Sequence, residues 1–149
     1  MTLYFKKLKG NAVLPQRATP TSAGADLCAC LDAPVELAPG STAMIPTGLA
    51  VQPSEAEVAL LIYPRSGLAA KHGITLANAV GVVDSDYRGE IKVALHNLGT
   101  QPFFVEDGMR IAQLVVTPVI FADMKETEEL DETERGCGGF GSSGFTTKR

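Results

Sequence analysis

The sequence predicts an all-β fold of short strands, arranged as a sandwich, a jelly roll or a small barrel. Its 15 glycines and 9 prolines are spread over 149 residues, which leaves little uninterrupted chain for helices. Short runs of apolar or alternating side chains lie between these breakers. Many short strands separated by turn residues are typical of sandwiches and barrels.

Three runs carry the clearest strand patterns. Residues 58–63 and 111–116 are nearly continuous apolar runs. Residues 91–95 alternate, so their odd-numbered positions share one face of a strand. All three are bounded by glycine or proline within a few residues, and we expect each to form a strand.

One short helix is expected among these strands, over residues 66–72. Ser66 has the side chain of a good N-cap, and Gly73 stands where a helix usually ends. The predicted fold is therefore all-β with a single helix of one or two turns.

The composition excludes several classes of function. A chain of 149 residues with 45% hydrophobic residues fits one globular domain, and its net charge of −4 disfavours a broad surface for nucleic acid or an anionic membrane. No apolar run approaches the ~20 residues of a membrane span. Lys6, Lys7 and Lys9 interrupt any signal-peptide pattern. The expected compartment is the cytoplasm, or the nucleus or an organelle in a eukaryote.

The three cysteines do not predict a disulfide framework. They cannot all pair, and Cys28 and Cys30 are too close in sequence for an ordinary bridge. A four-cysteine zinc site is equally excluded. We expect reduced thiols at Cys28, Cys30 and Cys137.

The composition changes near residue 122. Residues 1–122 hold the apolar runs, whereas residues 123–134 contain seven acidic residues and one lysine, a self-repelling linker. Residues 135–144 follow with five glycines, one arginine and one phenylalanine. We expect a core over 1–122 and a flexible linker and glycine-rich tail over 123–149.

Common catalytic motifs do not account for this chain. Gly136, Gly138 and Gly141 match a dinucleotide-binding spacing, but that motif needs a strand before it and a helix after it. The sequence contains neither a P-loop nor a His-Glu-x-x-His motif. Ser66 and His72 could belong to a serine hydrolase, but no nucleophile elbow accompanies them.

Five segments combine acidic, basic and glycine residues. Each has a plain structural explanation by itself, such as a turn, a helix cap or an ion pair. The segments are Ala-Gly-Ala-Asp-Leu at 23–27, Pro-Arg-Ser-Gly at 64–67, Gly-Val-Val-Asp-Ser-Asp-Tyr-Arg-Gly at 81–89, Arg-Ile-Ala-Gln-Leu at 110–114, and the tail at 135–144.

Together and in this order, the five segments resemble the motifs of the homotrimeric dUTPases, which hydrolyse dUTP to dUMP and pyrophosphate. The third segment and the tail are the most specific parts. The resemblance implies a jelly-roll-like β-barrel, a homotrimer, and a role in keeping uracil out of DNA while supplying dUMP for thymidylate synthesis.

The resemblance assigns the chemistry to one carboxylate. Asp84, in an expected hairpin over 81–89, corresponds to the residue that orients and deprotonates the attacking water. Asp86 is the rival base. Asp26 corresponds to an acid that pairs with Arg110 and stands near the water shell of Mg²⁺, which would have no direct protein ligand because the substrate phosphates and water hold it.

The resemblance also assigns the contacts to dUTP. The expected phosphate contacts are Arg65, Ser66, Gly67, Gln113, Arg135, Ser142 and Ser143. The expected contacts to uracil and deoxyribose are Asn78, Gly81, Val83, Tyr87 and Phe140. Main-chain groups over 78–83 would reject cytosine and thymine, and the Tyr87 ring would exclude a 2′-hydroxyl.

Each site would be shared by three subunits, with the tail closing over a neighbour as a lid that orders on nucleotide binding. Three alternatives remain: a dCTP deaminase of the same fold, a non-catalytic nucleotide-binding trimer, and a purely structural jelly-roll protein. The Asp84 segment favours the hydrolase over the deaminase.

Overall fold

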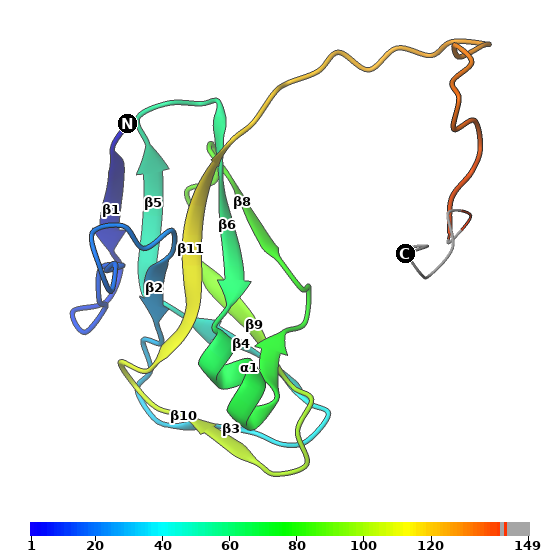
Figure 1. The fold of residues 1–149 in the computed structure, drawn as a ribbon. Coiled ribbons are helices and arrows are strands. Elements are labelled where there is room, and N and C mark those ends of the chain that lie inside the picture. The colour runs from blue at the N-terminus through cyan, green and yellow to red at the C-terminus, as the bar shows by residue number, and fades with distance from the viewer. Residues whose placement is uncertain (141, 143–149) are drawn as a thin grey trace.

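The chain forms eleven strands and one short helix in the part that the computed structural model describes, residues 1–140 and 142 (Figure 1). The elements are β1 (Leu3–Lys7), β2 (Ala25–Cys28), β3 (Val35–Leu37), β4 (Thr42–Pro46), β5 (Leu49–Pro53), β6 (Val58–Pro64), α1 (Ser66–His72), β7 (Ile74–Leu76), β8 (Gly81–Asp84), β9 (Lys92–Asn97), β10 (Phe103–Val105) and β11 (Arg110–Pro118). The all-β prediction with one helix is confirmed.

The strands form four antiparallel sheets. The largest has the order β2-β11-β6-β8, so the long strand β11 lies between β2 and β6 (Figure 1). A second sheet has the order β4-β9-β7, and β1-β5 and β10-β3 are two-stranded. Within the described residues these ladders do not join into one closed barrel.

The three predicted strands are confirmed with small changes at their ends. They correspond to β6, β9 and β11, the last of which extends to nine residues. Ile91, Val93 and Leu95 are each 1% exposed, as the alternation predicts. They join one apolar cluster with residues of β2, β6 and β11, and this cluster fixes the register of the strands that carry the quoted segments.

Helix α1 occupies the predicted residues, but its N-cap is Arg65 rather than Ser66. Arg65 has an extended backbone, and its carbonyl oxygen accepts the first helical hydrogen bond from Ala69 N at 3.0 Å. Ser66 is therefore the first helical residue. Gly73 ends the helix at φ 69°, where a Cβ would lie 2.7 Å from the backbone nitrogen of Gly99.

All three cysteines are free thiols, as expected. Cys28 and Cys30 are buried and Cys137 is exposed. Burial raises the pKa of the Cys28 and Cys30 thiols, so both stay protonated near neutral pH.

No helix within residues 1–140 and 142 has both the length and the apolar character needed to cross a bilayer.

Candidate active site

The carboxylate of Asp26 joins two of the quoted segments to its own. Its Oδ1 accepts a hydrogen bond from Arg65 Nε at 2.8 Å, and its Oδ2 accepts one from Arg110 Nη1 at 3.1 Å. Because β11 pairs with β2 on one side and β6 on the other, residues far apart in sequence meet here. The pairing with Arg110 is as expected. The bond from Arg65 was not expected, since Arg65 was assigned to phosphate alone.

A polar hollow of about 370 Å³ lies beside this ion-pair network. It contains four of the residues assigned to the phosphates, and its lining is Ala18, Ser22, Ala23, Gly24, Asp26, Arg65, Ser66, Gly67 and Gln113. A Cβ on Gly67 would meet no atom within 4 Å, so the space above this glycine is open. The hollow therefore offers a guanidinium, a hydroxyl and an amide to an anionic group.

A second hollow, of about 270 Å³, surrounds the predicted catalytic carboxylate. Asp84 is the last residue of β8 and is exposed. The lining residues are Met44, Val82, Val83, Asp84, Tyr87, Glu90, Ile91 and Lys92. Asp84, Val83 and Tyr87 are thus brought together, as the resemblance implied.

The Tyr87 ring in this hollow is positioned by a hydrogen bond from its hydroxyl group and by the space above Gly89. Its hydroxyl donates a hydrogen bond to the carbonyl oxygen of Glu90 at 3.1 Å. A Cβ on Gly89 would overlap the ring, so only glycine leaves room for Tyr87 in this position. Sequence reasoning did not assign this role to Gly89, because a glycine shows no sign of what lies against it.

The predicted hairpin over 81–89 is wrong in its pairing. The chain does turn after Asp84, but β8 pairs with β6, whereas β9 pairs with β4 and β7. The turn therefore connects two different sheets. The sequence shows strand, turn and strand, but not which neighbour each strand finds.

Of the residues expected to bind uracil, Asn78 lies just before β8, whereas Gly81 and Val83 lie within it. Asn78 is exposed, and a Cβ on Gly81 would lie 3.5 Å from Asn78 Nδ2 and 3.1 Å from the Cβ of Ile62. Ala79 has a φ of 60°, which is uncommon for a residue with a side chain. Val80 N donates to Asn78 O at 2.6 Å across it. This tight turn fixes the backbone before β8.

The two hollows lie at opposite ends of β6. Asp84 is paired with Ala59, near the start of β6, whereas Arg65 and Ser66 follow Pro64 at its end. Pro64 lies five residue steps along the extended strand from Ala59, a distance of about 17 Å. Within one copy of the chain, Asp84 is therefore remote from the arginine and amide of the first hollow.

The described residues of the tail line neither hollow. Figure 1 shows the chain leaving β11 and running away from the sheets, and residues 120–137 are all exposed. Arg135 Nε donates to Gly138 O at 2.8 Å, and the Phe140 side chain is fully exposed. The backbone nitrogen of Ser142 donates to Gly139 O at 3.0 Å, within the tail. Ser143 lies outside the described residues.

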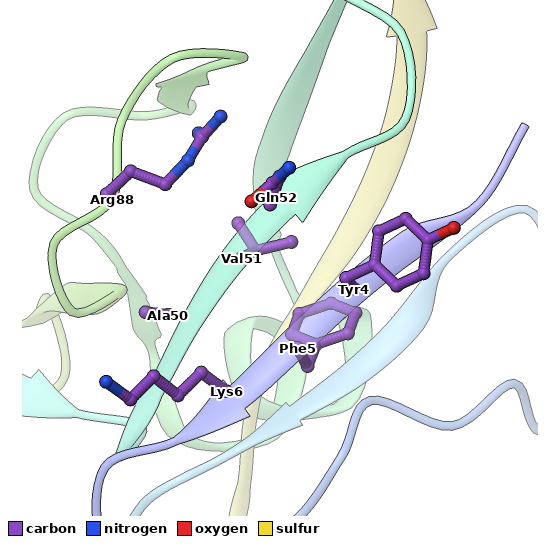
Figure 2. A pocket seen from close by; sticks show the side chains of 7 residues that line it. All are labelled: Tyr4, Phe5, Lys6, Ala50, Val51, Gln52 and Arg88. Carbon is purple, nitrogen blue, oxygen red and sulfur yellow. The ribbon is translucent and has the colours of Figure 1, made fainter.

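A third hollow, of about 310 Å³, lies away from these residues, between strands β1 and β5 and the turn after β8. Figure 2 shows its lining side chains, Tyr4, Phe5, Lys6, Ala50, Val51, Gln52 and Arg88. Only Arg88 comes from a quoted segment. Its Nη1 donates to the carbonyl oxygens of Ser85 at 2.7 Å and Tyr87 at 3.0 Å, so this arginine stabilises the turn after Asp84.

The described residues contain no group of three or more side chains suited to holding a metal ion directly. Asp26 is the acid nearest the phosphate residues, and both of its oxygens already accept hydrogen bonds from guanidinium groups. Its remaining lone pairs fit hydrogen bonds from metal-bound waters better than direct ligation.

Replacing Asp26 should destabilise the protein measurably. We expect Asp26→Ala to lower the free energy of unfolding by about 1–3 kcal/mol, because two guanidinium groups lose their shared acceptor and repel each other. The Asp26 side chain is 16% exposed, so solvent screens this pair only partly. Urea unfolding at fixed protein concentration measures the change.

Asp32 supplies a matched control. It pairs with Lys9 at 2.7 Å, but its side chain is 84% exposed. Asp32→Ala should therefore change the free energy of unfolding by less than about 1 kcal/mol. Equal losses in the two variants would contradict a structural role for the Asp26 network.

The fold and the hollows define an all-β protein with one hollow lined by an arginine, a hydroxyl and an amide, and a second that holds an exposed carboxylate beside a tyrosine. The chain belongs to the dUTPase family, whose profile matches residues 10–144. It is 56% identical over 143 residues to the deoxyuridine 5′-triphosphate nucleotidohydrolase of Desulfitobacterium hafniense, covering 96% of this chain and 94% of that protein. It is 54% identical to the one of Serratia proteamaculans, covering 88% and 86%.

Solved structures give the same result. The dUTPase of Staphylococcus bacteriophage 80alpha with dUpNHpp has a TM-score of 0.87 and 30% identity, over 97% of this chain and 99% of that chain. A mutant dUTPase from phage phi11 of S. aureus, described with a structural Mg(II) ion, has a TM-score of 0.77 and 25% identity, over 87% and 98%.

Proposed function

We propose that this protein hydrolyses dUTP to dUMP and pyrophosphate. The observation that carries the proposal is the exposed carboxylate of Asp84 at the end of β8, which shares one hollow with Val83 and Tyr87, in a chain of the dUTPase family. The relatives named above are deoxyuridine 5′-triphosphate nucleotidohydrolases, and this chain matches 94% and 86% of their lengths. The product dUMP would serve thymidylate synthesis, and removal of dUTP would keep uracil out of DNA.

The working unit is a homotrimer of jelly-roll-like cores, each built from residues 1–122. The separation of about 17 Å along β6 supports this, because Asp84 and Arg65 of one copy cannot act on the same phosphate group. Asp84 of one subunit meets the arginine-lined hollow of a second. Residues 123–149 of a third complete the site.

The Asp84 carboxylate orients a water against the α-phosphorus and takes its proton. A positioned base contributes about 10²- to 10⁴-fold to the rate. The phosphate oxygens are bound by Arg65, Ser66, Gly67 and Gln113, whose side chains or open backbone line the first hollow. These contacts hold the leaving pyrophosphate in line with the water and stabilise its charge.

Asp26 contributes by position rather than by contact with the reacting atoms. It holds the side chains of Arg65 and Arg110 in one arrangement through two hydrogen bonds. Mg²⁺ bound to the phosphates would neutralise charge on the leaving group. The remaining lone pairs of Asp26 would accept hydrogen bonds from waters bound to that ion.

Base and sugar are selected by residues on both sides of Asp84 and by one residue of the tail. Asn78 and the main chain at Gly81 and Val83 present hydrogen-bonding groups to the pyrimidine edge, and cytosine would leave some of them unpaired at about 1–3 kcal/mol each. The Tyr87 ring packs under the deoxyribose and leaves no space for a 2′-hydroxyl. The Phe140 ring stacks on the uracil face.

The tail is a lid that closes over a neighbouring subunit. Arg135, Ser142 and Ser143 bind the phosphates when it closes, and the acidic linker supplies the reach. The absence of side-chain hydrogen bonds or ion pairs between described residues 123–140 and the sheets supports this role.

The experiment that tests the function is pyrophosphate release from dUTP, dTTP, dCTP and UTP, each with Mg²⁺. We expect release from dUTP with at least about a hundredfold preference in kcat/KM over the others. Ammonia release from dCTP would instead identify a deaminase. Tight nucleotide binding without pyrophosphate would identify a non-catalytic binding protein.

A further inference from the structure

We infer that Gly24 is a positioning residue for phosphate binding, which acts by leaving room for the side chain of Gln113. The inference rests on the proposed function, because it concerns how Gln113 reaches the phosphates of dUTP. Both residues line the arginine-containing hollow. Gly24 lies just before β2, and Gln113 on β11 is paired with Asp26 of β2.

The close approach is specific to one side chain. A Cβ added to Gly24 would overlap Oε1 of Gln113 and would lie 3.1 Å from its Cβ and 3.2 Å from its Cδ. All three nearest atoms belong to Gln113. The Cβ of Gln113 is fixed by the paired strand β11, so the amide would have to rotate away.

Gly24 is not required for its backbone conformation. Among the described residues, the glycines with positive φ are Gly40, Gly48, Gly73, Gly108 and Gly136. Gly24 is absent from this group, so an alanine could adopt its backbone angles. Space, rather than φ, makes glycine necessary here.

The position of the Gln113 amide matters for its hydrogen bonds. Its Nε2 donates to the carbonyl oxygen of Pro64 at 3.0 Å, which orients the amide along the end of β6. One further N–H of Nε2 remains to donate to a phosphate oxygen. Rotation of the amide breaks the bond to Pro64 and turns this donor away from the hollow.

The experiment compares Gly24→Ala, Gln113→Ala and the double variant in steady-state dUTP hydrolysis. We expect Gly24→Ala to raise KM about tenfold, with kcat changed by less than about threefold, because the lost hydrogen bond serves the bound substrate and the transition state alike. In the Gln113→Ala background, adding Gly24→Ala should change KM by less than about twofold.

Gly10→Ala is the control, since a Cβ there meets no atom within 4 Å and its φ is not positive. It should leave KM unchanged. Two outcomes would overturn the inference. One is a double variant whose rise in KM equals the product of the two single rises, because the residues would then act independently. The other is an unchanged KM in Gly24→Ala.

Folding gives a second readout. If Gly24→Ala alone does not fold, the double variant should fold, because it removes Oε1 and Cδ of Gln113 and leaves only the approach of the two Cβ atoms at 3.1 Å. A double variant that also fails to fold would overturn the inference. Failure of the unsubstituted protein to hydrolyse dUTP would instead overturn the proposed function, whatever the variants do.

Discussion

Asp84→Asn should abolish turnover while dUTP still binds with nearly unchanged affinity. The amide keeps the size and shape of the carboxylate but cannot accept a proton from water, so we expect the rate to fall at least about 10²- to 10⁴-fold. Asp84 makes no ion pair within the described residues, so its neutralisation leaves no partner unpaired. Single-turnover pyrophosphate release measures the rate, and equilibrium binding of a non-hydrolysable dUTP analogue measures the affinity.

Asp86→Asn is the matched control for this experiment. Asp86 follows Asp84 by two residues and is also exposed, but it lines none of the three hollows described above. Its substitution should leave the rate within a few-fold of the unsubstituted protein. An inactive Asp86→Asn variant together with an active Asp84→Asn variant would identify Asp86 as the base.

The fold could be predicted from local sequence because its signals are local. The alternation at Val93 and Leu95 marks the buried face of β9, which the equally buried Ile91 precedes, and Gly73 marks the end of α1. The prediction of a hairpin over 81–89 was wrong because strand pairing is not a local property. Strand pairing depends on which apolar faces meet in the core, and a short strand such as β8 has no pattern that selects β6 over β9.

The site could be predicted only as far as side-chain chemistry shows in the motifs. Asp84, Tyr87 and Arg65 were assigned because the resemblance covers them. The bond from Arg65 to Asp26 joins residues 39 positions apart, and it depends on the register that β11 imposes on β2 and β6. The role of Gly24 is defined by the neighbour that a side chain would meet.

Removing residues 135–149 should cut kcat/KM for dUTP at least about a hundredfold without unfolding the protein. The deletion removes Arg135 and the Phe140 ring, and an arginine that reaches a transferring phosphoryl group contributes about 10³- to 10⁵-fold in enzymes that use one. The buried apolar clusters contain none of the described residues of this segment, 135–140 and 142. Thermal unfolding at matched concentration should therefore be unchanged, and a lower melting temperature would contradict a lid role.

Co-expression of this truncated chain with the Asp84→Asn chain tests whether one site is built from several subunits. Each variant alone should be nearly inactive, because the truncated chain lacks the lid and the Asp84→Asn chain lacks the base. Asp84 and the arginine-lined hollow lie at opposite ends of β6, and the tail runs away from both (Figure 1). Trimers co-expressed from both chains should therefore contain sites with an intact Asp84 from one subunit and an intact tail from another, and activity should return. Co-expressed chains that assemble together yet stay inactive would show that each chain must supply its own base and lid.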